Sequence, residues 1–104
     1  NSKNKDFFIA RAFLKIKINL FSEAIDDFDN AINIDQNNTF LFFQKGIYEI
    51  ELGNFGEAVK NFDIALKKSF ENNFDPGLIE IHRIFAEEKY IENFQDLLTK
   101  NKLL

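Results

Sequence analysis

The feature that most constrains this chain is a short pattern that occurs twice, at residues 21–31 and again at residues 55–65. The pattern reads F-x-E-A-x-x-x-F-D-x-A, and six of its eleven positions are identical in the two copies. The match extends upstream, where Phe8 corresponds to Phe42 at the same offset. Self-similarity at a fixed period of roughly 20–50 residues is typical of proteins built from stacked supersecondary units. The sequence therefore predicts a repeat protein.

The spacing of apolar residues within the pattern predicts helices. Ala24, Phe28 and Ala31 stand at i, i+4 and i+7, which is one face of an α-helix, and the second copy repeats this arrangement. We expect another helix before each copy, over roughly residues 6–18 and 39–52. No segment alternates between apolar and polar residues over the length of a strand, so we predict an all-α fold.

The last third of the chain departs from the repeat. Asp75 and Pro76 are typical of a helix N-cap and first helical residue, so a fifth helix is expected to begin there. We expect a turn at Lys89 and Tyr90, followed by a sixth amphipathic helix. Residues 75–104 are interpreted as a degenerate third repeat or a capping helix pair, because terminal repeats of such arrays are commonly atypical.

The two copies resemble tetratricopeptide repeats, which are helix–turn–helix units of about 34 residues. The second copy carries the family's bulky, small, turn and A-x-x-x-aromatic-x-x-A positions as Phe42, Gly46, Gly53, Ala58, Phe62 and Ala65. The first copy carries them as Phe8, Ala12, Asn19, Ala24, Phe28 and Ala31. The chain departs from the family at Asn19, where the pattern has glycine, and at Gln36 and Phe70, where it has proline.

The resemblance implies a single domain over residues 1–104, with repeat 1 at 5–37, repeat 2 at 38–71 and the atypical segment at 75–104. The expected fold is all-α, with antiparallel helix-turn-helix repeats that form a short right-handed superhelix, or α-solenoid. In this family the first helix of each pair lines a concave side that binds other proteins. Transferred position by position, that side consists of Asp6, Ile9, Phe13, Ile16, Lys17, Phe40, Phe43, Ile47, Ile50 and Glu51.

Seven of these ten side chains are Ile or Phe, which predicts a hydrophobic groove. Soluble monomers rarely expose a large apolar patch, so we expect the groove to be covered. The occupant we favour is an apolar or amphipathic helical segment of a partner protein, with Phe13 and Phe43 as its anchors. Two alternatives remain open, namely closure by the chain's own C-terminal helices and closure by a second copy in a homodimer.

Composition and motifs argue against other classes of function. The net charge of −4 disfavours nucleic acid, which requires a clustered basic surface, and no apolar run is long enough to span a bilayer. Without cysteine there is no thiolate metal site, and we predict no cofactor. The one histidine, His82, has only Ser22 and Ser69 as candidate hydroxyl partners besides Ser2, and these are read as helix-end residues. We therefore predict no enzyme activity, and we favour the cytoplasm without assigning a compartment.

Overall fold

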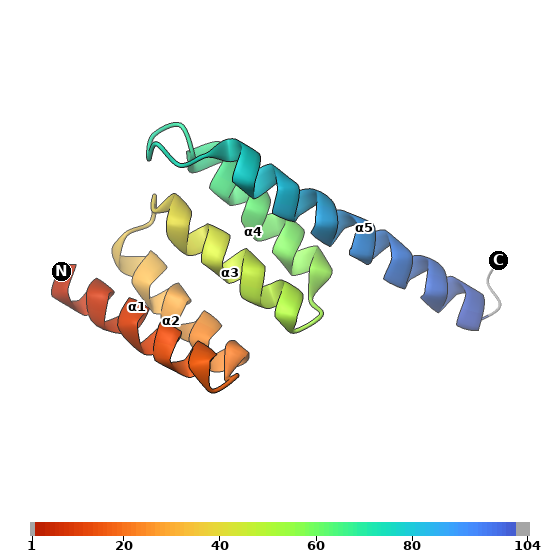
Figure 1. Ribbon diagram of the computed structural model, residues 1–104, viewed down its shortest axis with the longest axis horizontal. Coiled ribbons are helices and arrows are strands. Elements are labelled where there is room, and N and C mark those ends of the chain that lie inside the picture. The colour runs from red at the N-terminus through yellow and green to blue at the C-terminus, as the bar shows by residue number, and fades with distance from the viewer. Residues whose placement is uncertain (1, 102–104) are drawn as a thin grey trace.

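The computed structural model describes residues 2–101, and within them the chain forms five α-helices and no β-strand (Figure 1). The helices are α1 (Ser2–Lys17), α2 (Phe21–Ile34), α3 (Thr39–Glu51), α4 (Phe55–Lys68) and α5 (Pro76–Lys100). Adjacent helices pack closely along an elongated molecule of 52 × 31 × 19 Å. The predicted all-α arrangement of helical repeats is confirmed. Among the described helices, none combines the length and the apolarity needed to cross a membrane.

The turns that close the two hairpins, α1–α2 and α3–α4, have the same backbone geometry. Asn19 and Gly53 take φ values of 63° and 79°, the left-handed conformation that ends a helix in a Schellman motif. The next residue in each turn donates its N–H to a carbonyl five positions earlier, at 2.9 Å from Leu20 and 2.8 Å from Asn54. Gly53 adopts this conformation freely because it has no Cβ, and Asn19 performs the same role because asparagine tolerates it.

The repeated pattern forms the centre of each hairpin's core. Six of its side chains are completely buried: Ala24, Phe28, Ala31, Ala58, Phe62 and Ala65. The alanines allow the facing helix to approach closely, and the phenylalanine ring fills the space between them. At Gly46 of α3 the approach is so close that an added Cβ would lie 2.5 Å from Cε1 of Phe62. The helix pairing within each hairpin therefore depends on small residues at fixed positions.

Successive hairpins stack through a recurring ion pair. Lys45 of α3 pairs with Asp29 of α2 at 2.8 Å, and Arg83 of α5 pairs with Asp63 of α4 at 2.6 Å. The step in numbering from Asp29 to Asp63 equals the repeat period of 34, whereas the step from Lys45 to Arg83 is 38. Helix α5 thus packs on α4 in the way that α3 packs on α2, but in a shifted register.

The longer linker before α5 accounts for three of the four residues by which the register changes from 34 to 38. The linker before α5 covers residues 69–75, whereas the one before α3 covers only residues 35–38. The same offset of 38 relates Leu41 of α3 to Ile79 of α5, and both side chains are fully buried. Asp75 caps α5 by accepting a hydrogen bond from the Gly77 N–H at 2.9 Å, which confirms the predicted start of the fifth helix.

The predicted sixth helix and the turn at Lys89 and Tyr90 are wrong, because α5 continues without interruption for 25 residues. With the offset of 38, Ile91 stands where Gly53 and, one repeat earlier, Asn19 adopt positive φ. A β-branched residue is strongly disfavoured in the left-handed region, so the turn does not form. The chain has no glycine or proline between Gly77 and Lys100, and the helix continues.

Candidate protein-binding surface

The predicted binding residues of the first repeat lie on α1. Ile9, Phe13 and Ile16 are half-buried against the core of the first hairpin, and the ring of Phe13 meets the ring of Phe28 edge-on at 5.7 Å between centroids. Asp6 and Lys17, at the two ends of this stripe, are exposed; they are polar margins of an apolar stripe.

The second repeat presents its predicted residues on α3. Phe40 is 37% exposed and approaches Phe13 of α1, with ring centroids 6.3 Å apart, so the stripes of the two helices adjoin. Ile47 and Ile50 are half-buried against the core of the second hairpin, and Glu51 is exposed at the end of the helix. The structure thus brings the predicted stripes of α1 and α3 together at Phe13 and Phe40.

Phe43, expected to be an open anchor, lies instead inside the core and is only 5% exposed. Its ring centroid lies 5.9 Å from that of Phe62, 5.3 Å from that of Phe74 and 5.0 Å from that of His82. Phe74 belongs to the linker before α5, and His82 belongs to α5 itself. The C-terminal segment covers this position, as one of the two alternatives anticipated, so Phe43 forms the floor of the surface.

Helix α5 adds exposed apolar residues that were not among the predicted binding residues. The offset of 38 makes Leu78, Ile81 and Phe85 the equivalents of Phe40, Phe43 and Ile47, and they are 41%, 67% and 46% exposed. The first-helix positions of α1, α3 and α5 together constitute what we call the three-helix apolar face: Ile9, Phe13, Ile16, Phe40, Ile47, Ile50, Leu78, Ile81 and Phe85. An alignment at an offset of 34 or 35 conceals the contribution of α5.

Two charged residues of α1 are directed toward α2. Arg11 donates to both carboxylate oxygens of Asp27, at 2.7 Å from Nη2 to Oδ1 and 3.0 Å from Nε to Oδ2. Lys15 adds an ion pair at 3.0 Å, and the Asp27 side chain is only 1% exposed. The hydrogen bonds from Arg11, followed by those from Lys15, lower the pKa of Asp27 despite its burial. The network holds α1 to α2 and leaves the apolar stripe of α1 facing outward.

The second hairpin carries a different charge arrangement at the equivalent positions. Glu49 of α3 is only 8% exposed and corresponds to Lys15. Burial raises the pKa of Glu49, and a hydrogen bond with Asn54 opposes the shift. Asn61 replaces Asp27, and its side-chain amide donates to the carbonyl of Glu57 at 3.0 Å. Glu49, the buried acid of this hairpin, therefore has the amide of Asn54 beside it. In the first hairpin, Asp27 is paired with two basic residues.

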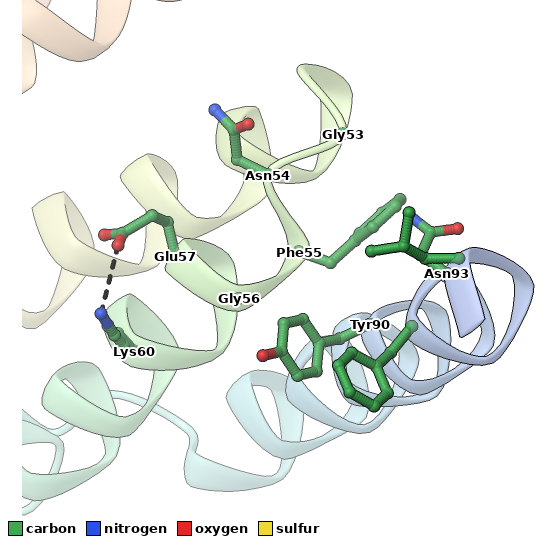
Figure 2. A pocket seen from close by; sticks show the side chains of 10 residues that line it. Gly53, Asn54, Phe55, Gly56, Glu57, Lys60, Tyr90 and Asn93 are labelled. Atoms are coloured by element: carbon green, nitrogen blue, oxygen red, sulfur yellow. Dashed lines mark hydrogen bonds and ion pairs between the residues drawn. The ribbon is translucent and has the colours of Figure 1, made fainter. Parts of the chain in front are cut away.

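An open cavity of about 530 Å³ lies between the start of α4 and the distal part of α5. Figure 2 shows Phe55 on one side and Tyr90 on the other, with Asn93 at the far end. The ring of Tyr90 covers Gly56, where an added Cβ would lie 3.1 Å from Cε2. The walls of the cavity are mainly apolar, and the Glu57–Lys60 ion pair, at 3.3 Å, lies at its polar rim. Nothing in the sequence pattern indicated this cavity, because it arises from the unbroken helix α5.

His82 and Ser69, two of the candidate catalytic groups, have structural contacts. His82 Nδ1 lies 2.9 Å from the carbonyl oxygen of Leu78, and its ring packs on Phe43. The Ser69 hydroxyl donates to the carbonyl of Leu66 at 2.8 Å. Within residues 2–101 no three His, Cys, Asp or Glu side chains are grouped in a way that could hold a metal ion.

Comparison with known proteins gives no identification from sequence. No protein-family model matches the chain, and no curated protein is significantly similar to it. Function must therefore be argued from the surface itself.

Proposed function

We propose that this chain is a non-catalytic protein-interaction module of the tetratricopeptide type, which binds an apolar or amphipathic helical segment of a partner protein on its three-helix apolar face. The observation that supports this proposal most directly is that α1, α3 and α5 each carry half-buried or exposed apolar side chains at equivalent positions. Phe40, Ile81 and Phe85 are its most accessible large side chains, together with Leu78 at its edge.

The physical argument rests on the cost of leaving such a face in water. Burial of apolar area contributes about 25 cal/mol per Å², and exposed apolar patches on soluble proteins commonly mark interaction sites. An amphipathic helix presents apolar side chains at i, i+3, i+4 and i+7, which suits a shallow stripe formed by three neighbouring helices. The acidic and basic ends of the α1 stripe, Asp6 and Lys17, would lie at the rim of such a contact.

The alternative function is a structural helical unit whose face is closed from within, and the burial of Phe43 favours it. Phe74 and His82 cover that ring completely enough to leave 5% exposed. The closure is local, however, because Phe40 and Ile81 remain exposed. We therefore propose that α5 completes the binding face and at the same time seals its centre.

A selection from a displayed library of amphipathic helical peptides tests the proposal. Selected peptides are expected to bind the chain in titration calorimetry, and Phe40→Asp is expected to weaken that binding at least about tenfold, as for a central aromatic contact. Leu14→Asp is the control, because it also places a carboxylate at an exposed apolar position. Leu14 is 64% exposed on α1, and it lies outside the three-helix apolar face. Equal binding by Phe40→Asp and the unmodified chain would reject the face, and failure to select any peptide would reject the function.

A further inference from the structure

The distal part of α5, beyond the contact of Tyr90 with Gly56 of α4, is largely exposed. Figure 1 shows α5 extending past the N-terminal end of α4. Every residue from 90 to 97 is exposed. Tyr90, Ile91, Phe94 and Leu97 are 51%, 48%, 53% and 56% exposed. In α1 and α3 the face that carries Ala12 and Gly46 is covered by the returning helix of the hairpin, whereas α5 has no returning helix within the described residues.

The apolar residues of this segment are arranged symmetrically about Phe94. Tyr90 and Ile91 precede it by four and three residues, and Leu97 and Leu98 follow it by three and four residues. At about 3.6 residues per turn, all five side chains fall within about a third of the helix circumference. A two-fold axis through Phe94 would therefore place each of these residues opposite another apolar residue of an identical, antiparallel helix. We call these five residues the α5 patch.

We propose that the α5 patch is a homodimer interface in which the distal halves of two α5 helices pair antiparallel about a two-fold axis at Phe94. Tyr90 of one copy then packs against Leu98 of the other, and Ile91 packs against Leu97. An isologous interface requires a surface that is complementary to itself, and the symmetric spacing about Phe94 supplies it. The patch is separate from the three-helix apolar face, so the proposal goes beyond the function proposed above.

The area of the patch matches what a stable dimer needs. A large side chain has roughly 150–250 Å² of surface, so four that are about half exposed, with the partly exposed Leu98, leave about 450 Å² per copy and about 900 Å² per pair. Standard interfaces bury about 1,200–2,000 Å² in total, of which about 56–65% is apolar. The apolar area available therefore lies within the range of a standard interface.

The helix itself also gains from a second copy. An isolated helix shorter than about 12–15 residues is marginal in water, and the residues of α5 from 91 to 97, beyond the contact of Tyr90 with Gly56, are all exposed. The cavity next to Phe55 leaves the α4-facing edge of the patch open, so Leu97 and Phe94 are accessible from that direction as well. A paired α5 supplies the lateral contacts that a returning helix supplies to α1 and α3.

Sedimentation and light scattering of the full chain test the proposal. The unmodified chain is expected to form a dimer, and Phe94→Asp is expected to raise the dissociation constant at least about tenfold with unchanged helicity, because it places two carboxylates on the axis. Ile81→Asp and Leu14→Asp are matched controls at more exposed apolar positions, 67% and 64%, on other faces. Both are expected to leave the dimer intact.

A charge exchange tests the register of the pair. Ile91→Asp and Leu97→Lys are each expected to be monomeric alone, because each sets two charged groups against apolar neighbours. An equimolar mixture is expected to form a heterodimer, since one pair of facing positions becomes Asp with Lys while the other stays Ile with Leu. A single-cysteine Phe94→Cys variant of this cysteine-free chain is expected to cross-link to itself, and an Ile81→Cys variant is not.

Four results would overturn the inference. The first is an unmodified chain that stays monomeric at millimolar concentration, and the second is a dimer that survives Phe94→Asp. The third is a mass that keeps growing with concentration and falls with Leu14→Asp, which would indicate head-to-tail stacking through the outer face of α1. The fourth is a mixture of Ile91→Asp and Leu97→Lys that remains monomeric.

Discussion

Replacing Gly46 by alanine tests whether the close approach of α3 and α4 controls stability. Glycine inside a helix is less favourable than alanine by about 0.5–1 kcal/mol, so at an open site this substitution would stabilise the protein. At Gly46 the new Cβ would lie 2.5 Å from Cε1 of Phe62 and 2.8 Å from its Cδ1 and Cζ, far inside van der Waals contact. Phe62 cannot withdraw easily, because it is completely buried and its ring packs against Phe43.

The expected magnitude follows from these opposing effects. Overpacking a close-packed core costs about 1–3 kcal/mol, and this cost exceeds the gain in helix propensity. We expect Gly46→Ala to lower the free energy of unfolding by about 1–2 kcal/mol, which corresponds to a fall in melting temperature of roughly 4–16 °C for a domain of this size. Urea unfolding followed by circular dichroism measures the first quantity directly.

Gly56→Ala is the matched control, since it places a Cβ 3.1 Å from the ring of Tyr90, which is half exposed and free to move. We expect this variant to be at least as stable as the unmodified protein. In a Phe62→Leu background the penalty for Gly46→Ala should largely disappear, because the ring that obstructs the Cβ is absent. A Gly46→Ala protein with an unchanged or higher urea midpoint would show that the hairpin does not depend on the glycine.

Two further predictions concern buried carboxylates. Asp27→Asn should destabilise the protein by about 2–3 kcal/mol at neutral pH by breaking the network with Arg11 and Lys15. Because the pKa of Asp27 is lowered by folding, this difference should hold above the unfolded pKa of about 3.9 and shrink as pH falls through the folded pKa. Glu49→Gln should stabilise the protein at pH 7, because burial raises the pKa of Glu49 and disfavours its charged form. The stability that Glu49 contributes is present below its unfolded pKa of about 4.3 and is lost as pH rises through the folded pKa. Urea midpoints between pH 3 and pH 7 check both, and parallel pH profiles for all three proteins would contradict both.

The parts of the fold that could be predicted from sequence are those fixed by local chemistry and exact repetition. The two hairpins follow from the spacing of small and aromatic residues, and the four alanines of the pattern, with Phe28 and Phe62, are fully buried. The cap at Gly53 follows from its freedom to adopt positive φ, and the start of α5 follows from Asp75 and Pro76. Each of these features depends on residues close together in the chain.

The candidate site was less predictable, because it depends on which helix comes to lie over which side chain. Phe43 occupies the same repeat position as Ile9, and sequence alone gives both the same environment. Ile9 remains half-buried on α1, whereas Phe43 is covered by Phe74 and His82 because α5 packs beside α3. The longer linker before α5 shifts the register of this helix. The length of the linker alone does not give the offset of 38, which is shown by the Arg83–Asp63 ion pair.

The residue at the hairpin-turn position decides whether the last helix is covered by a returning helix of the same chain or stays open to another molecule. A glycine or asparagine at a hairpin turn reverses the chain, and the returning helix buries the face that carries the small residues. Ile91 at that position keeps α5 straight, so the segment that would have formed the returning helix extends outward with its apolar residues exposed. Those residues, from Tyr90 to Leu98, still have the spacing of a buried helix face. In the proposed dimer, an identical antiparallel helix makes the contacts that a returning helix would have made within one chain. The unbroken helix and the symmetric α5 patch therefore have one cause, the absence of a turn at Ile91.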